Sequence, residues 1–314
     1  MARRDPLNGK LVTVVGGSGF LGDHVAQALL SRGCRVRIAS RNPKRAFRLK
    51  PLAQLGQIQF VRCDARRPDS VAAVVAGADA VVNLVGTFAG DVMGTIADSA
   101  AKIAEAAAAQ GCEAMVHVSA IGADPDSPAT YARAKAESEA EVLAAFPNAT
   151  ILRPGVLFGE DDNFVQMFAR LIARLPVLPV FAPDAPLQPL SVDDAAAAIV
   201  AALADPAAHG GKTYEIAGPE TITMLELNRR IAESQNRQRG FIAMPDGLSA
   251  LFAALPGTPM NGDQWALLKA GNRPSHALPG ITELGITPRP LDLFLDRWMT
   301  RYRKYGRFSD TVAG

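Results

Sequence analysis

The sequence predicts an α/β protein built on a doubly wound parallel sheet, followed by a smaller C-terminal α/β lobe. Two observations indicate this fold class. Short β-branched runs alternate with helical stretches through the first half of the 314-residue chain, in the order that right-handed crossovers between parallel strands require. The first run, at residues 11–15, leads into a glycine cluster and then into a helical pattern at 23–32, as in the first unit of such a sheet.

The same alternation predicts the other elements. Strands are expected at 35–39, 58–62, 80–85, 114–119, 150–152 and 213–217, and helices at 70–76, 91–110, 130–146, 195–204 and 225–234. Prolines become frequent after Pro154, which marks a change of organisation. We therefore expect a first domain at 1–155, with a returning segment at about 186–217, and a smaller lobe at 156–314.

The glycine cluster has the spacing Gly16-x-x-Gly19-x-x-Gly22 between a strand and a helix. In this context Gly16 allows a sharp turn, Gly19 allows backbone to approach a pyrophosphate, and Gly22 allows the helix to pack closely on the strand. The helix N-terminus supplies N–H groups and a positive dipole end for the phosphates. An ordinary glycine-rich turn is the alternative, and the flanking strand and helix count against it. The other binding residues expected in this turn are Ser18, Phe20 and Leu21.

The end of the second strand predicts which dinucleotide binds. An NAD-binding fold usually has an acidic residue there for the ribose hydroxyls, but this chain has Ser40 and Arg41, with Lys44 and Arg45 close behind. A guanidinium pairs with a 2′-phosphate that a carboxylate would repel. We therefore expect a Rossmann domain that binds NADP(H) in preference to NAD(H). The alternative is that these basic side chains only solvate an exposed loop.

Later strand ends supply further expected cofactor contacts. Asp64 follows the third strand, where it can accept from an adenine amino group, and the fourth strand leads to Val85 and Gly86, where backbone can lie beside the cofactor. Pro154 follows the sixth strand and is expected in the same site.

A second set of residues has the pattern of a catalytic group. Ser119 ends the fifth strand, and Tyr131 and Lys135 lie four residues apart on the next predicted helix, so they share one helix face. An ammonium near a phenol lowers the phenol pKa and lets it exchange a proton with a substrate oxygen. A surface Tyr and Lys that merely share a face is the alternative.

This arrangement resembles the catalytic set of the short-chain dehydrogenase/reductase family, in its extended or atypical branch. The resemblance implies that Tyr131 is the acid and base, that Lys135 binds the ribose and the phenolate, and that Ser119 orients the substrate. Tyr131 and Lys135 therefore also count as cofactor-binding residues. Catalysis does not follow from these residues alone, because Lys135 can be kept for ribose binding.

The second half resembles a narrower group, the dinucleotide-binding accessory subunits of respiratory complex I, the NADH:quinone oxidoreductase, in their bacterial form. The segments that carry this resemblance are 152–164, 175–180, 188–194 and 214–220. It implies a nucleotide with a mainly structural role, and other subunits of complex I as partners. Two alternatives stay open: an active NADP-dependent reductase or epimerase acting on a carbonyl or secondary alcohol, and a regulator that senses NADP(H).

The last predicted helix has one apolar stripe and several basic residues. The stripe comprises Leu291, Phe294, Leu295, Trp298, Met299 and Tyr302, and the basic residues are Arg297, Arg301, Arg303, Lys304 and Arg307. Such a helix most often packs on its own lobe. The alternative is a contact with a partner subunit or with anionic lipid.

Composition sets the remaining expectations. A net charge of +2 and a pI of about 8.5 give no electrostatic reason to expect nucleic-acid binding. The three cysteines and four histidines show no metal-ligand spacing, so no metal is expected. No apolar run has the length of a membrane span, and the first residues leave no room for a presequence. We expect a cytoplasmic protein, peripheral on the cytoplasmic face of a bacterial inner membrane.

Overall fold

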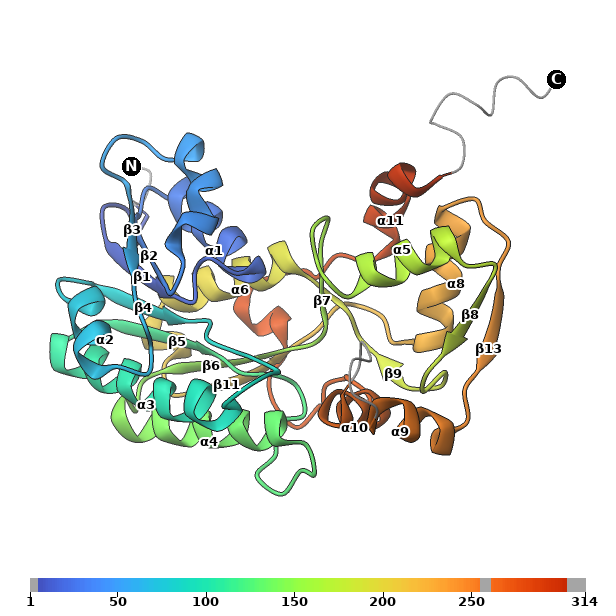
Figure 1. Ribbon diagram of the computed structural model, residues 1–314. Helices are drawn as coiled ribbons and strands as arrows, with labels where there is room; N and C mark the ends of the chain where they lie inside the picture. Colours follow the sequence, from blue (N-terminus) through green and yellow to red (C-terminus); the bar gives the residue numbers. More distant parts are fainter. Residues whose placement is uncertain (1–4, 255–260, 304–314) are drawn as a thin grey trace. The chain divides into compact units, whose positions relative to one another are not determined.

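The structure, a computed structural model, describes residues 5–254 and 261–303 (Figure 1). The chain divides into two compact units. The first comprises Met1–Pro154, Val192–Ile216 and Pro274–Thr287, and the second comprises Gly155–Ser191, Ala217–Arg273 and Pro288–Gly314.

This division differs from the expected one at two segments. Residues 186–191 lie in the second unit, outside the segment that returns to the first, and residues 274–287 lie in the first unit instead of the lobe. Side-chain and backbone contacts hold the latter segment. Glu215 Oε2 accepts hydrogen bonds from the backbone N–H and the hydroxyl of Ser275, at 2.5 and 2.7 Å, and the Glu215 N–H donates to Pro279 O.

Seven parallel strands form one sheet in the first unit, in the order β11-β6-β5-β4-β1-β2-β3. The strands are β1 (Leu11–Val15), β2 (Arg35–Ser40), β3 (Ile58–Arg62), β4 (Ala80–Asn83), β5 (Ala114–Val118), β6 (Thr150–Pro154) and β11 (Thr213–Ile216). The chain runs outward from β1 through β2 and β3 and then crosses back to β4 on the other side of β1. The sheet is therefore doubly wound, and the predicted fold class is confirmed.

The burial of the strands explains their composition. Every residue of β1, β4 and β5 is buried, whereas the edge strand β3 is only partly covered. Strands covered on both faces read as continuous apolar runs. β4 ends at Asn83, two residues before the expected end, because Asn83 Oδ1 accepts a hydrogen bond from the Val85 N–H at 3.0 Å and the chain turns there.

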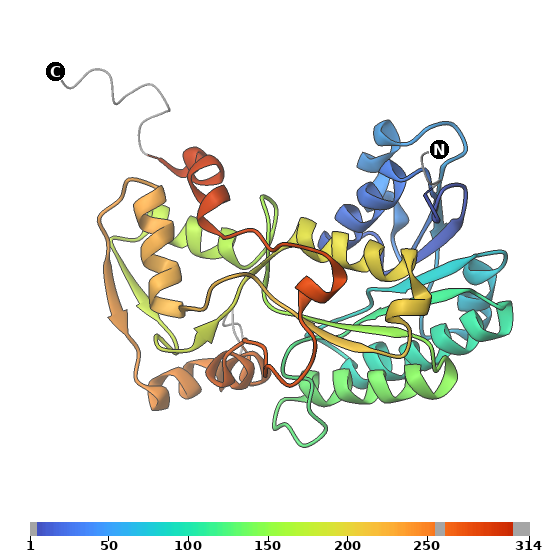
Figure 2. The ribbon, with the colours of Figure 1, turned by 180° about the vertical axis from the view of Figure 1, so that it is seen from behind.

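Helices cover both faces of this sheet (Figures 1 and 2). On one face lie α1 (Phe20–Ser31) and α6 (Val192–Ala204), and on the other lie α2 (Pro68–Val75), α3 (Val92–Gln110) and α4 (Thr130–Ala145). Shorter segments are the 3-10 helices η1 (Pro43–Leu52) and η2 (Ile281–Leu284) and the helix α7 (Pro206–His209). The cysteines Cys34, Cys63 and Cys112 are free and buried in this unit.

The second unit combines short two-stranded sheets with helices. The strand pairs are β7 (Leu157–Phe158) with β10 (Leu190–Ser191), β9 (Pro186–Leu187) with β12 (Ile222–Thr223), and β8 (Val177–Val180) with β13 (Gly240–Ala243). The helices are α5 (Val165–Arg174), α8 (Met224–Ser234), α9 (Asp246–Ala254), α10 (Gly262–Ala270), α11 (Asp292–Met299) and η3 (Thr300–Tyr302). Phe158, Ile172 and Ile231 lie at the centre of the core that α5, α8 and α11 share.

The predicted C-terminal stripe packs inside this unit. Leu291, Leu295 and Met299 are buried, and Phe294 and Trp298 pack against the same core. The apolar side that a lipid contact would need is therefore already covered. The basic residues Lys304 and Arg307 lie outside the described residues.

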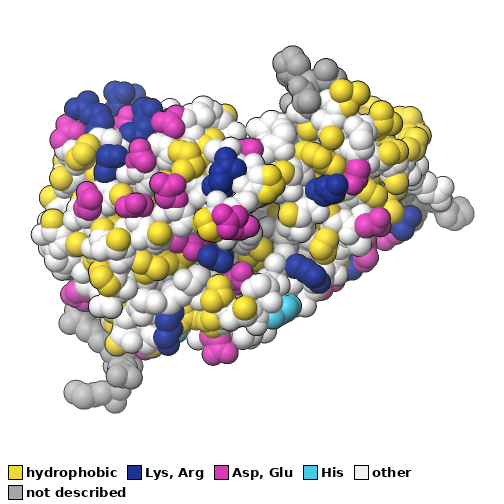
Figure 3. Space-filling view, turned by 90° about the horizontal axis from the view of Figure 1, so that it is seen from below, with side chains coloured by type: hydrophobic (Ala, Val, Ile, Leu, Met, Phe, Trp, Pro, Cys, Tyr) yellow, Lys and Arg dark blue, Asp and Glu magenta, His cyan; other side chains and the backbone are white. Residues whose placement is uncertain are grey.

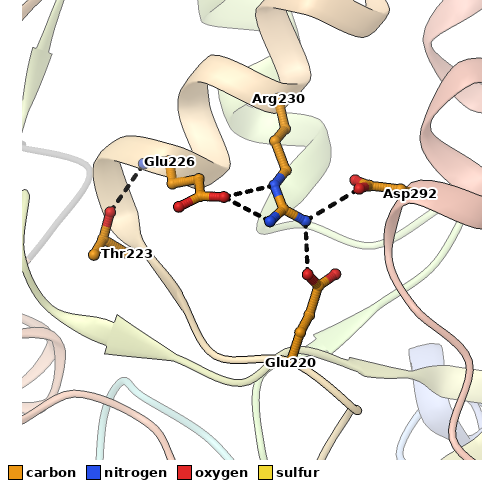
Figure 4. Close-up of polar contacts among 5 residues, drawn as sticks. All are labelled: Glu220, Thr223, Glu226, Arg230 and Asp292. Atoms are coloured by element: carbon orange, nitrogen blue, oxygen red, sulfur yellow. Dashed lines mark hydrogen bonds and ion pairs between the residues drawn. The ribbon is translucent and has the colours of Figure 1, made fainter.

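An ion cluster fastens α11 to α8 (Figure 4). The Arg230 guanidinium binds Glu226 at 2.5 Å, Glu220 at 2.9 Å and Asp292 at 3.2 Å. Thr223 caps α8, since its hydroxyl accepts a hydrogen bond from the Glu226 N–H at 3.1 Å. The cluster joins the segment before α8 to α8 and α11 within one unit.

The surface shows no segregation of charge on the face drawn in Figure 3, where Lys and Arg side chains lie among Asp and Glu. This face therefore carries no basic stripe of the kind on which nucleic acids bind. Within residues 5–254 and 261–303, no helix combines the length and apolarity needed to cross a membrane.

Candidate nucleotide-binding site

The glycine turn has little room for side chains at two of its three glycines. Gly16 has φ +83°, and a Cβ there would lie 3.0 Å from the Leu84 carbonyl group. A Cβ on Gly22 would lie 2.6 Å from the backbone of Gly17, so its role is to bring the helix onto the turn itself. At Gly19, which is exposed, the nearest such atom is Gly16 O at 3.5 Å. Of the three glycines, Gly19 has the most exposed backbone.

The helix after this turn begins earlier than expected, at Phe20 instead of residue 23. Its N-cap is Gly19, which makes no side-chain capping hydrogen bond. The first N–H groups of a helix have no partner within the helix, and at this end they favour an anion. Ser18, Phe20 and Leu21 are half-buried around them, and the Phe20 ring packs edge-on against His24.

Two buried hydroxyl groups lie at the carboxyl edge of the sheet. Ser40 ends β2 and Ser119 follows β5, and neither Oγ atom has a hydrogen-bond partner among the described residues. Parallel strands place their carboxyl ends at one edge, where the order reverses between β1 and β4 and ligands bind. Buried hydroxyls without partners are uncommon. The accessible backbone and these two hydroxyls fit a polar ligand such as a dinucleotide.

Lys135 lies on α4 and reaches this edge. It is 3% exposed, and its Nζ donates to Val118 O at 2.8 Å and lies 3.5 Å from Val85 O. A Cβ on Gly86 would lie 3.9 Å from the same Nζ. Burial lowers the Lys135 pKa to about 8, against a smaller raising effect of Glu139. The structure thus brings Lys135, Val85 and Gly86 together, as the sequence-based set requires.

Tyr131 lies one turn before Lys135, but its pKa is not lowered. The Lys135 Nζ is 5.9 Å from the centroid of the Tyr131 ring, and burial raises the pKa of Tyr131 to about 12. The prediction that Lys135 lowers the pKa of Tyr131 is therefore wrong for this structure. The sequence reasoning also missed Phe88, whose ring stacks on Tyr131 with centroids 4.2 Å apart.

The basic residues expected at the 2′-phosphate are exposed. Arg41 follows β2, and Lys44 and Arg45 lie at the start of η1. The pKa of Asp64 falls to about 2, because hydrogen bonds from Arg66 and the nearby charge of Arg41 stabilise its carboxylate. Arg66 binds both oxygens of Asp64, at 3.1 and 2.9 Å, so an adenine amino group would share an acceptor that already has a partner.

A buried polar chain links the fourth and fifth strands to α4. Asn83 Nδ2 lies 3.0 Å from His117 Nδ1, and His117 Nε2 lies 2.9 Å from Ser138 Oγ. Ser138 in turn donates to the Lys135 carbonyl at 2.7 Å. Burial holds the His117 pKa well below its usual value, so the ring is neutral and joins the strand edge to the turn that carries Lys135.

The sixth strand ends beside the turn that follows Ser119. Pro154 is the buried last residue of β6, and its carbonyl accepts from the Ile121 N–H at 3.1 Å. Over the part of the chain that the structure describes, no group of His, Cys, Asp and Glu residues is arranged to hold a metal ion.

Comparison with known proteins agrees with this geometry. A family described as NAD(P)H-binding matches residues 16–206. A protein of Arabidopsis thaliana, NADH dehydrogenase (ubiquinone) 1 alpha subcomplex subunit 9, mitochondrial, is 32% identical over 99% of this chain and 82% of its own length. Ceramide reductase of Caulobacter vibrioides is 29% identical over 75% of this chain and 74% of its own length.

The fold also has solved neighbours. An NADPH-dependent quinone oxidoreductase from Escherichia coli, solved with NADPH, has a TM-score of 0.71 at 20% identity and covers 91% of this chain and 99% of its own. At this identity the likeness concerns the fold. The first two matches confirm the predicted group: the chain belongs to the NAD(P)H-binding proteins and, among them, to the group of NADH dehydrogenase (ubiquinone) 1 alpha subcomplex subunit 9.

Proposed function

We propose that this chain is an NADP(H)-binding accessory subunit of a bacterial respiratory NADH:quinone oxidoreductase, in which the nucleotide has a mainly structural role. The observation that carries the proposal is the extent of the similarity, since 99% of the chain aligns with a named subunit of that enzyme class. The alignment therefore includes the second unit as well as the first. We place the subunit at the cytoplasmic face of the membrane, where it contacts other subunits and does not span the bilayer.

The proposed nucleotide is NADP(H), held by the residues of the first unit. The α1 N-terminus and Gly19 take the pyrophosphate, Lys135 donates to the nicotinamide ribose, and Arg41 pairs with the 2′-phosphate. When bound, a nicotinamide cofactor supplies or accepts a hydride. The preference over NAD(H) rests on the absence of a carboxylate at Ser40-Arg41, where it would repel a phosphate.

A structural role for the nucleotide agrees with the chemistry of Tyr131. A phenol with a pKa of about 12 is neutral at pH 7, so it donates a hydrogen bond but is a weak base. Tyr131 also stacks on Phe88, which fixes its ring. These features do not supply the base that oxidation of an alcohol would need.

The test is incorporation into the membrane complex. Tagged wild type, Arg41→Glu and Tyr131→Phe are expressed, membranes are solubilised gently, and the tagged protein is isolated together with NADH:quinone activity. We expect Arg41→Glu to lose retained NADPH and incorporation, and Tyr131→Phe to keep both. Isolation of the wild type without any respiratory subunit would overturn the assignment, and equal loss in both variants would overturn the structural role.

A second candidate is an active NADP-dependent reductase acting on a carbonyl or secondary alcohol. The Ser119 hydroxyl favours it, because it is buried without a partner and can hold a substrate oxygen, and ceramide reductase is among the relatives. In this case purified protein should oxidise NADPH with a carbonyl or quinone substrate. Tyr131→Phe should then abolish turnover while NADPH still binds, and no turnover across such a panel would exclude this candidate.

A further inference from the structure

A buried acidic residue lies in the first turn of the phosphate-binding helix. Asp23 is 2% exposed, and its carboxylate pairs with the Arg48 guanidinium from η1. A buried carboxylate without a counter-charge is strongly unfavourable. In this position its negative charge would also offset the positive end of the helix dipole, which attracts a phosphate. Arg48 therefore cancels a charge that would weaken anion binding.

The same ion pair ties η1 to α1. Other contacts of η1 hold it on the sheet: the Phe47 ring packs edge-on against Phe60 of β3, with centroids 5.0 Å apart, and Leu49 is buried. The pair with Asp23 is the contact that links η1 to the phosphate-binding helix through charge. A 3-10 segment has weak hydrogen-bond geometry of its own, so its placement depends on such contacts.

The segment that is tied in this way carries the exposed cations Lys44 and Arg45 and begins two residues after Arg41. We propose that the Asp23–Arg48 ion pair positions these cations for the 2′-phosphate of NADP(H) and is thus a determinant of NADPH over NADH selectivity. Asp23 and Arg48 act through the placement of η1 and need not touch the nucleotide. The inference rests on the proposed NADP(H) site and adds the ion pair that orients its cations.

The experiment compares affinities for NADPH and NADH in the full chain, by fluorescence titration. In Asp23→Asn the tether is lost, and we expect the Kd for NADPH to rise about tenfold, as for loss of one charge-assisted contact. The Kd for NADH should stay within about twofold, because the shared pyrophosphate and ribose contacts remain. The ratio of the two affinities is the readout, since a general loss of structure would weaken both nucleotides alike.

Two further variants serve as controls. Arg48→Lys keeps the positive charge and should retain most of the selectivity, whereas Arg48→Met should lose it. Arg32→Met breaks an ion pair whose carboxylate, that of Asp5, is more exposed than that of Asp23, and Arg32 is the C-cap at the other end of α1, so the affinity ratio should not change. Far-ultraviolet circular dichroism and thermal unfolding identify any variant that fails to fold.

The outcomes separate this inference from the proposed function. An unchanged ratio in Asp23→Asn and Arg48→Met, or equal loss of both affinities, overturns the inference while a wild-type preference for NADPH leaves the cofactor assignment standing. A wild type that binds both nucleotides equally overturns both. A ratio that falls in Asp23→Asn and Arg48→Met but not in Arg32→Met supports the positioning role.

Discussion

Lys135 should make the nucleotide-free protein less stable than a variant without its charge. An unperturbed lysine has a pKa of 10.5, and burial lowers that of Lys135 to about 8. At about 1.4 kcal/mol for each pKa unit, keeping the ammonium charged in the folded state costs about 3 kcal/mol. Replacement by the unbranched, apolar side chain of methionine removes this cost.

The substitution also removes the hydrogen bonds of Lys135, of which the one to Val118 O is the shorter. The hydrogen bond from Lys135 Nζ to Val118 O at 2.8 Å is charge-assisted and contributes about 1 to 2 kcal/mol. We therefore expect Lys135→Met to raise the free energy of unfolding by about 1 to 2 kcal/mol at pH 7. Urea unfolding without nucleotide, followed by tryptophan fluorescence and circular dichroism, measures this difference.

The pH dependence of the stability difference shows whether the Lys135 charge causes it. Between pH 8 and 10.5 the unfolded lysine still binds a proton and the folded one does not, so the stability of the wild type should rise with pH in this window, relative to Lys135→Met. Below pH 8 both states hold the proton, and the advantage of the variant should be constant. A variant that is less stable than the wild type at pH 7, or a difference that does not shrink above pH 8, would refute the reasoning.

Two other substitutions test packing and charge. Gly22→Ala should destabilise the protein by about 2 kcal/mol and weaken NADPH binding, because its Cβ would lie 2.6 Å from the Gly17 backbone. Gly247→Ala is the control, since its Cβ would meet nothing within 4 Å. In the same thermal-unfolding and binding assays it should leave stability and NADPH affinity unchanged or slightly improved. Arg230→Met should lower the stability by about 1 to 2 kcal/mol at pH 7, because three partly exposed carboxylates lose their shared partner. An unchanged free energy of unfolding in urea would contradict this explanation.

The fold could be predicted because its determinants are local. The run at β1, the glycine spacing and the turn to α1 lie within a dozen residues, and each constrains the backbone directly. Lys135 was expected at the nucleotide site because the resemblance to the short-chain dehydrogenase/reductase family implies it, whereas the spacing of four fixes only the helix face that it shares with Tyr131. The strand order then places α4 beside the carboxyl edge of the sheet.

The contacts that escaped prediction join residues distant in sequence. Phe88 stacks on Tyr131, Asp23 pairs with Arg48, and Glu215 holds Ser275. The sequence around each of these residues gives no sign of its distant partner. The shift of the Tyr131 pKa escaped for the same reason, since the burial that sets it comes from the assembled fold and opposes the effect expected from Lys135.

The cost of the Lys135 charge has a consequence for the nucleotide. A ribose that accepts a hydrogen bond from this ammonium would compensate the buried charge. Because a ligand that binds only the folded state stabilises it, NADPH should stabilise the wild type by about 2.7 kcal/mol when free NADPH is near 100 times its Kd. Lys135→Met cannot make this contact and should gain less. The order of stability should therefore reverse, with the variant more stable without NADPH and the wild type at least as stable with it. Thermal unfolding of both proteins across an NADPH titration tests this. If saturating NADPH left the wild type unchanged, the nucleotide would not be part of what holds the fold.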